Sequence, residues 1–272
     1  MTAAPDRQIL IGVHVTGAGE GLAATLSSVF ENTPLPFGLR ILPDSAAASR
    51  APGLLQLRLA PASMVQRPSP AQPGAAACFN QLVSEPADIY VFLENGVRVC
   101  PGWLELLLAA LDSDASHGLA GPSTNRGWNE QAVAPNCGST QEALWDQADA
   151  LLARYGNVCV PLSPLHSLAD FCYVVKNEVV AAIGAVLRQA SADEWVRRLA
   201  PRGLVVAAVG SLNDALEGDI ARDRGLVVTL GDGGVALRAV ASPLRFSGYV
   251  PRYGLPPLLN EHAETVLRKD LV

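Results

Sequence analysis

The sequence has few charged residues, few cysteines and no apolar run of membrane-spanning length. Charged residues make up 17% of its 272 residues, and the net charge is −6. Nucleic-acid-binding proteins usually present a basic face, and here Lys and Arg are too scattered to form one. We therefore expect no nucleic acid as partner. A small phosphate-bearing ligand is still compatible, because helix N-termini and bound cations hold phosphate without a basic surface.

The five cysteines are widely spaced, and none forms a Cys-x-x-Cys pair. This spacing argues against a zinc site and against a disulfide framework. No apolar run approaches the length of a membrane span, so no integral membrane segment is expected. The first residues, MTAAPDRQILIGVHV, lack the cationic start and the cleavage site of a signal peptide. Together these features predict a cytoplasmic protein with reduced cysteines.

What the sequence does contain is an alternation of apolar runs and helical spacings, in a chain that is 49% apolar. We expect strands at 8–15, 37–42, 54–59, 89–93, 117–122, 170–175 and 204–209, and helices at 20–32, 74–83, from 101 onward, and at 141–155, 178–183 and 193–199. Such alternation predicts an α/β protein with a mostly parallel, doubly wound sheet flanked by helices. Ligands of such sheets lie beyond the carboxyl ends of the strands, here 14–17, 44–45, 94–96 and 123–125.

The chain changes character after residue 210. A segment with a charged helical face is followed by an apolar pair of runs around Gly231-Asp232-Gly233-Gly234, which predicts a hairpin. We therefore divide the chain into a domain at 1–215 and a C-terminal extension at 216–272. The extension ends in a Pro-rich tail after Ser242, which fits either a linker or a contact in a homo-oligomer.

Seven blocks, in this order, resemble those of the family-2 glycosyltransferases. They are ILIGVHVTGAGEGLAATLSSVFENT, Asp44-Ser45, AAACFNQLV, FLENGVRVCPGWLELLLAAL, GLAGPSTNRGWNEQ, DFCYVVKNEVVAAIG and DEWVRRLAPRG. The resemblance covers roughly residues 8 to 215. It implies the GT-A fold of nucleotide-diphospho-sugar transferases. It also implies a hexosyltransferase-type enzyme that transfers a sugar from a nucleotide-diphosphate sugar, a UDP-sugar first of all, to an acceptor with inversion.

The resemblance also assigns roles to particular residues. Glu194, with Asp193 beside it, falls on the general base that takes the proton of the acceptor hydroxyl. The other reading of this pair is that two acids stabilise a helix N-terminus. The positions that the resemblance implies for nucleotide-sugar binding are Asp44, Asn80, Glu94, Asn95, Thr124 and Asn125. His14, inside an apolar strand, is expected to be a satisfied core or cleft histidine rather than a metal ligand.

The resemblance further implies a divalent cation, Mg²⁺ or Mn²⁺, that neutralises the diphosphate leaving group. Glu94 falls on the first acidic position of the family's metal motif and is the candidate ligand. Gly96 stands where the family places its direct metal-binding Asp, and a late metal-binding His is also missing. The other reading of Glu94-Asn95-Gly96 is a polar turn in which Gly96 takes a positive φ.

Two rival functions remain open from the sequence. A catalytically inactive GT-A domain could bind a nucleotide sugar or a protein partner, which the loss of the acid at Gly96 favours. Another nucleotide-binding enzyme, such as a nucleotidyltransferase or a dehydrogenase, is the third reading. Gly17, Gly19 and Gly21 imitate the dinucleotide-binding fingerprint, but their spacing is Gly-x-Gly-x-Gly instead of Gly-x-Gly-x-x-Gly.

Overall fold

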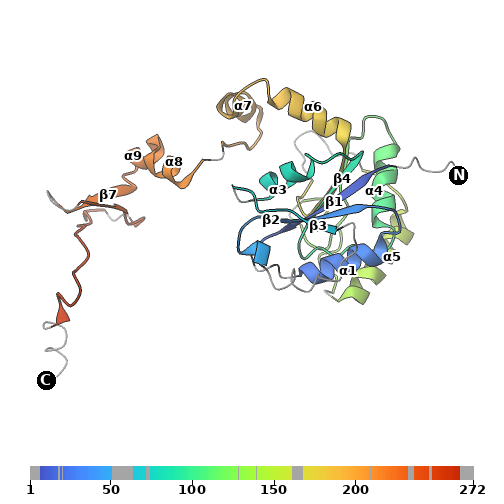
Figure 1. The fold of residues 1–272 in the computed structure, drawn as a ribbon, viewed down its shortest axis with the longest axis horizontal. Helices are drawn as coiled ribbons and strands as arrows, with labels where there is room; N and C mark the ends of the chain where they lie inside the picture. The colour runs from blue at the N-terminus through green and yellow to red at the C-terminus, as the bar shows by residue number, and fades with distance from the viewer. Residues whose placement is uncertain are drawn as a thin grey trace. The chain divides into compact units, whose positions relative to one another are not determined.

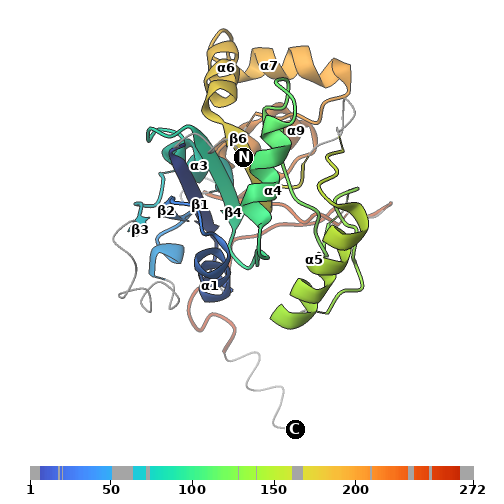
Figure 2. The same cartoon turned by 90° about the vertical axis from the view of Figure 1, so that its right-hand side faces the viewer.

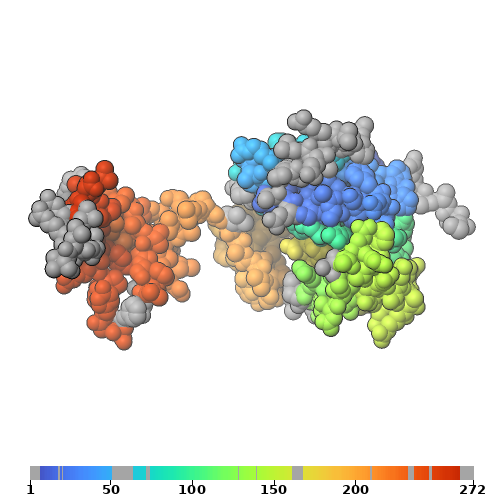
Figure 3. Space-filling view, turned by 90° about the horizontal axis from the view of Figure 1, so that it is seen from below, coloured from blue at the N-terminus to red at the C-terminus, as the bar shows by residue number. Residues whose placement is uncertain are grey.

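The computed structural model describes residues 7–17, 19, 21–50, 64–71, 74–127, 129–138, 140–160, 168–208, 210–231, 236–244 and 247–263. The chain forms two compact units, Met1–Ser191 and Ala192–Val272 (Figure 3). Each unit holds its own sheet (Figure 1). The sequence-based boundary after residue 215 falls inside helix α8 (Leu212–Glu217) of the second unit and stays a prediction.

The first unit is built on a six-stranded sheet in the order β3-β2-β1-β4-β6-β5 (Figure 1). The strands are β1 (Ile9–Val15), β2 (Gly38–Pro43), β3 (Met64–Gln66), β4 (Ile89–Glu94), β5 (Leu119–Ala120) and β6 (Cys172–Lys176). Strand β1 pairs in parallel with β2 and β4, and β2 with β3. Strand β6 runs antiparallel to β4 and β5. The predicted α/β class with a mostly parallel sheet flanked by helices is confirmed.

Helices cover both faces of this sheet, because successive side chains of a strand point to opposite sides. Ile11 and Val13 of β1 belong to the apolar core that also holds α1 (Leu22–Asn32) and α4 (Trp103–Asp112). Leu10 belongs to a second core with α3 (Ala75–Leu82). Figure 2 shows α3 and α4 on either side of β1 and β4. Burial of apolar surface on both faces is the main stabilising contribution to this unit.

The remaining elements of the first unit are the short helix η1 (Ala48–Arg50), α5 (Gln141–Tyr155) and α6 (Asn177–Leu187). Helix α5 begins at its N-cap Thr140, whose hydroxyl accepts a hydrogen bond from the amide of Ala143. Gly156, with φ +59°, follows its last residue. The helix therefore begins directly after a capping residue and ends directly before a glycine, two signals that commonly mark helix ends.

The second unit contains α7 (Ala192–Leu199), η3 (Ala200–Arg202), α8, α9 (Asp219–Asp223), β7 (Val227–Leu230) and β8 (Leu237–Val240). Strands β7 and β8 pair antiparallel, so the predicted hairpin is confirmed. Its predicted turn at 231–234 begins at Gly231, with φ +82°, and residues 232–234 lie outside the described residues. The side chain of Ser211 and the amide of Asp214 form one half of a reciprocal cap at the start of α8.

Three expectations for single strands had other outcomes. The strand expected at 54–59 lies outside the described residues. The strand expected at 204–209 is wrong for 204–208, which form no strand, and the side chain of Val205 is fully exposed. An apolar run becomes a strand only where a partner offers hydrogen bonds. Strand β3 is the third case: no strand was expected at 64–66, and one forms there because it pairs with β2.

In the part of the chain that the structure describes, no helix combines the length and the apolar character needed to cross a membrane.

Candidate functional site

Polar side chains gather at the carboxyl ends of three neighbouring parallel strands. Asp44 follows β2, His14 is the last residue but one of β1, and Glu94 ends β4, with Asn95 next. Because β2, β1 and β4 are adjacent and run in the same direction, these ends meet at one edge of the sheet. We call His14, Asp44, Glu94 and Asn95 the polar edge. It is the position at which open α/β sheets bind ligands.

His14 and Glu94 are register partners on β1 and β4. Paired residues of parallel strands point to the same face, so both side chains lie on the α3 side of the sheet. The Nδ1 atom of His14 stands 2.8 Å from each carboxylate oxygen of Glu94. The Nε2 atom stands 3.8 Å from Oδ2 of Asp44, which is beyond hydrogen-bond distance. The imidazole therefore lies between two carboxylates, one from each neighbouring strand.

The surroundings of His14 favour its protonated form. The ring is only 4% exposed and packs edge-on against Phe79 of α3, with 5.8 Å between ring centres. This burial alone lowers the pKa of His14, but interactions with the side chains of Cys78 and Glu94 outweigh it and raise the pKa to about 10. The raised pKa favours the imidazolium form of His14, which pairs with the carboxylate of Glu94.

The turn after β4 is fixed by backbone contacts as well as by side chains. The amide of Asn95 donates to the carbonyl of His14 at 2.9 Å, and its Oδ1 accepts from the amide of Thr16 at 3.0 Å. Gly96 has φ +96°, so the predicted positive φ at this position is confirmed. A Cβ placed on Gly21 would stand 2.8 Å from the Cα of Gly96, so the two backbones approach closely.

A row of buried polar side chains on α1 holds the chain that follows this turn. The hydroxyl of Thr25 accepts a hydrogen bond from the amide of Gly96 at 2.8 Å. The hydroxyl of Ser28 accepts from the amide of Val99 at 3.1 Å, and Nδ2 of Asn32 donates to the carbonyl of Val99 at 3.0 Å. Buried polar groups need such partners, so these three residues fix the path from the polar edge to α4.

The residues at the polar edge do not fit a divalent cation. Mg²⁺ and Mn²⁺ prefer carboxylate oxygens, and here the ring of His14 faces both oxygens of Glu94 from the side where Asp44 lies. Gly96 offers no side chain, and Oδ1 of Asn95 is held by Thr16. Among the described residues, no group of three or more His, Cys, Asp or Glu side chains is placed to hold a metal ion. The predicted role of Glu94 as a metal ligand has no support in this geometry.

The other predicted binding residues lie farther from His14 and Glu94. Asn80 is exposed on α3, the helix whose Cys78 and Phe79 reach His14. Thr124 and Asn125 follow β5, which is separated from β4 by β6. Because β5 and β4 are both antiparallel to β6, they point the same way, and the two strands lie about 10 Å apart across two strand spacings. These residues are on the same edge of the sheet as Glu94.

The loop that carries Thr124 is shaped by one buried amide side chain. Oε1 of Gln131 accepts from the amide of Ala169 at 2.7 Å, and its Nε2 donates to the carbonyl of Pro122 at 2.8 Å. The amide of Thr124 donates in turn to the carbonyl of Gln131 at 2.7 Å. Gln131 thus gives this loop a defined conformation, which a solvated polar loop would lack.

The predicted base lies in the second unit, on α7. Oε1 of Glu194 is 2.6 Å from Nε of Arg198, and Oε2 is 2.6 Å from Nη2 of Arg197. The hydrogen bond from Arg198 and then the charge of Arg197 lower the pKa of Glu194. A carboxylate with a lowered pKa accepts a proton less readily, so these contacts oppose the role of general base. Asp193 is exposed beside it in the first turn of α7.

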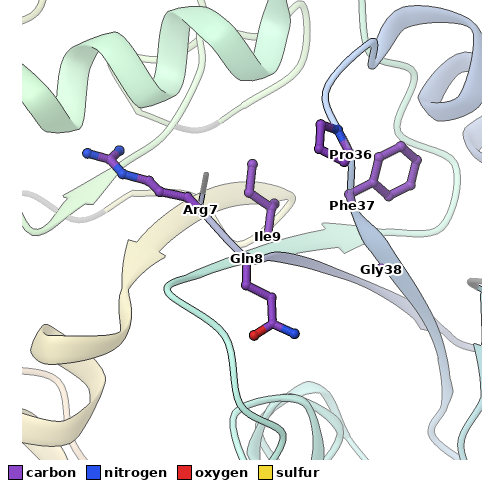
Figure 4. Close-up of a pocket in the computed structure, with 6 residues that line it drawn as sticks. All are labelled: Arg7, Gln8, Ile9, Pro36, Phe37 and Gly38. Atoms are coloured by element: carbon purple, nitrogen blue, oxygen red, sulfur yellow. The ribbon is translucent and has the colours of Figure 1, made fainter. Parts of the chain in front are cut away.

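Two shallow hollows lie away from the polar edge. One is lined on α5 by Gln141, Glu142, Trp145 and Asp146. Figure 4 shows the other, where Arg7, Gln8 and Ile9 approach Pro36, Phe37 and Gly38. Ile9 and Gly38 begin β1 and β2, so this hollow lies at the amino-terminal edge of the sheet, the opposite end from His14. Neither hollow is therefore lined by a residue of the polar edge.

Sequence reasoning missed the contacts of His14. Its burial in a strand was expected, but the register that sets it opposite Glu94 depends on which strands are neighbours. The one available signal was the strand order of a doubly wound sheet, which would have put both residues at the same edge. Thr25 was missed too, because a threonine inside an amphipathic helix gives no sign of what it will bind.

The chain was compared with known proteins. Solved structures with a similar fold include residues 1–349 of TarS from S. aureus, at 11% identity and TM-score 0.45, over 65% of this chain and 49% of that chain. A second is the mannosyltransferase PcManGT from Pyrobaculum calidifontis in complex with GDP-Man and Mn²⁺, at 12% identity and TM-score 0.43, over 67% and 49%. The chain thus spans about half the length of these two structures.

A third similar structure is glucosyl-3-phosphoglycerate synthase from Mycobacterium tuberculosis in complex with Mn²⁺, UDP and phosphoglyceric acid. It matches at 17% identity and TM-score 0.42, over 86% of this chain and 87% of that chain. No curated protein sequence matches the chain.

One family model, CoA-transferase family III, matches residues 147–263, which is fewer than half of the residues. The match begins inside α5 and includes none of β1, β2 and β4. It therefore does not bear on the polar edge.

Proposed function

We propose that the first unit binds a nucleotide-diphosphate sugar, with a UDP-sugar as the first candidate, and that the chain is a family-2-type glycosyltransferase with the GT-A fold. In this proposal it transfers the sugar to an acceptor with inversion. The observation that carries the proposal is the polar edge itself. Asp44, His14 and Glu94 meet at the carboxyl ends of three adjacent parallel strands, where such sheets bind nucleotides.

The position of each block supports the same proposal. Asp44, which the resemblance assigns to the nucleobase or ribose, lies 3.8 Å from the ring of His14. Its carboxylate and that of Glu94 are acceptors suited to the hydroxyl groups of a ribose or sugar. Thr124 and Asn125 stand farther along the same edge, on a loop that Gln131 holds in shape. A sugar nucleotide that extends along the edge would meet both groups of residues.

A second candidate is a domain that binds a nucleotide sugar without transferring the sugar. The contacts of Glu194 favour it, because two arginines hold both carboxylate oxygens and lower the pKa. A base in this state would have to exchange an arginine for the acceptor hydroxyl before it could take a proton. The two candidates share the binding step and differ only in turnover.

Calorimetric titration of the full chain with UDP, GDP and their sugars tests the binding step. We expect one of these nucleotides to bind, and we expect Glu94→Gln to weaken that binding by removing one charge from the polar edge. Glu178→Gln on α6 is the matched control, because Glu178 is an exposed acid in the first turn of a helix. If none of these nucleotides binds, the proposed function is wrong.

Release of UDP or GDP from the bound sugar nucleotide tests transfer, with slow hydrolysis counted as turnover. A transferase that uses Glu194 as its base loses turnover in Glu194→Gln while nucleotide affinity is kept. Turnover that is absent from the wild type, with binding intact, supports the second candidate. Turnover that survives in Glu194→Gln would remove Glu194 from the mechanism and leave Asp193 as the remaining acid of that pair.

A further inference from the structure

The ring of His14 fills the space between the two carboxylates of the polar edge. His14 is 4% exposed, and its Nδ1 stands at hydrogen-bond distance, 2.8 Å, from both oxygens of Glu94. Its Nε2 is buried without a hydrogen bond and faces Asp44 at 3.8 Å. The ring therefore sits where a metal ion shared by the two carboxylates would have to sit.

The rest of the edge offers a metal ion little else. Gly96 has no side chain, and its φ of +96° together with the close approach of Gly21 fixes a glycine backbone there. Asn95 uses its Oδ1 to accept from the amide and the hydroxyl of Thr16, at 3.0 and 3.3 Å. The protein ligands left for a divalent cation are therefore the carboxylates of Glu94 and Asp44, and His14 lies between them.

From this geometry we propose that the ring of His14 fills the position between Glu94 and Asp44 where a metal ion would bind, and that the polar edge takes up no divalent cation. The proposal concerns the same site as the proposed function and deepens it: the nucleotide would bind without Mg²⁺ or Mn²⁺. It does not require that a nucleotide binds at all, because the metal alone can be tested. The failure of one proposal is therefore distinct from the failure of the other.

The geometry predicts a gain of metal binding when His14 is replaced. In His14→Asn, Glu94 and Asp44 lose the charge between them and become two unpaired carboxylates at one edge. Carboxylate charge and number set the affinity of a protein for hard divalent cations, so Mn²⁺ affinity should rise by at least about tenfold. In the double variant His14→Asn/Glu94→Gln the second carboxylate charge is gone, and the gain should disappear.

The experiment is a titration of Mn²⁺ into the full chain, followed by the electron paramagnetic resonance signal of the free ion. For the wild type we expect no uptake at this edge up to about 1 mM Mn²⁺, and an unchanged result for Glu94→Gln. Uptake by the wild type that Glu94→Gln removes would overturn the proposal. So would a folded His14→Asn variant that binds Mn²⁺ no better than the wild type.

A second measurement uses only the wild type, in case His14→Asn does not fold. Bound Mn²⁺ broadens the nuclear magnetic resonances of nearby protons, so the ring protons of His14 report on a metal at Glu94. We expect these resonances to keep their width at Mn²⁺ concentrations that leave the exposed His262 unchanged. Selective broadening of the His14 resonances would overturn the proposal.

Discussion

His14 and Glu94 face each other across two adjacent parallel strands, with one ring nitrogen 2.8 Å from both carboxylate oxygens. This pair changes how the role of Glu94, the acid at the end of β4, is interpreted. In a metal-dependent site that acid would coordinate a cation from solution, whereas here a neighbouring strand supplies the positive charge. The site is therefore set up by the fold of the chain itself.

The pair predicts how stability depends on pH. The pKa of His14 is raised from 6.5 to about 10 in the folded chain, so its contribution is present in full below pH about 6.5 and is lost as the pH rises toward 10. The wild type should therefore lose stability to urea between pH 7 and 10, and Glu94→Gln should lose less. Asp44 and Cys78 also face the ring. Tyr173 interacts with Glu94, and burial raises the pKa of Tyr173 to about 12, above this range.

Urea unfolding at pH 7, 8.5 and 10 measures this difference, because the slope of stability against pH counts the protons taken up or released. Glu178→Gln, on the exposed surface of α6, should follow the wild type. Equal slopes for the wild type and Glu94→Gln would show that Glu94 does not hold the proton on His14.

We expect any side chain placed at position 96 to destabilise the turn after β4. At φ +96° any residue with a Cβ is strained, so Gly96→Ala and Gly96→Asp should each lower the free energy of unfolding by about 1–2 kcal/mol. No atom stands within 4 Å of a Cβ at this position, so the loss comes from the backbone and not from a clash. Chemical denaturation gives both values, and a Gly96→Ala variant as stable as the wild type would contradict this account.

We expect the turn after β4 to depend on the hydroxyl of Thr25. Thr25→Val keeps the shape of the side chain but leaves the amide of Gly96 without its acceptor, and should cost about 1–3 kcal/mol. Thr25→Ser keeps the hydroxyl and should cost less. Hydrogen exchange of the Gly96 amide gives a local readout, with faster exchange in Thr25→Val only. Similar exchange in both variants would mean that the hydroxyl does not hold this turn.

We expect α3 to pack so closely on β1 at Gly12 that a larger residue would not fit there. A Cβ at this position would stand 2.7 Å from Cδ2 of Leu82 and 2.8 Å from Cδ1 of Leu42, both of which are fully buried. Gly12→Ala should therefore destabilise the unit by about 1–3 kcal/mol through overpacking. Gly38→Ala is a useful comparison, because its nearest contact, at 3.0 Å, is a single atom of Leu10. Equal losses in thermal unfolding would contradict the tight packing of α3.

The sequence predicts the helices and strands that have a strong local pattern of apolar residues. It does not predict the contacts that depend on how those helices and strands are arranged in space. Strands β1 and β4 are continuous apolar runs, and the positions of Asp44 and Glu94 at strand ends followed from them. Strand β3 has only three residues and forms through its pairing with β2, so no local pattern predicts it. The run at 204–208 shows the converse, since its apolar pattern has no partner strand in the described part of the chain.

The candidate site divides in the same way. The positive φ of Gly96 follows from residue type alone, because glycine is the residue that tolerates it. The pairing of His14 with Glu94 follows from strand order and register, which a single sequence does not contain. The arginine contacts of Glu194 are an exception, because spacings of three and four residues on a helix predict them.

Calorimetric titration of the wild type with UDP and GDP, in EDTA and in Mn²⁺, tests most directly the claim that the polar edge binds a nucleotide with His14 in place of a metal. The account predicts that one nucleotide binds with the same dissociation constant in both solutions, within about twofold, and more weakly to Glu94→Gln. Binding that appears only with Mn²⁺ would contradict the role of His14. Binding of neither nucleotide in either solution would contradict the proposed function.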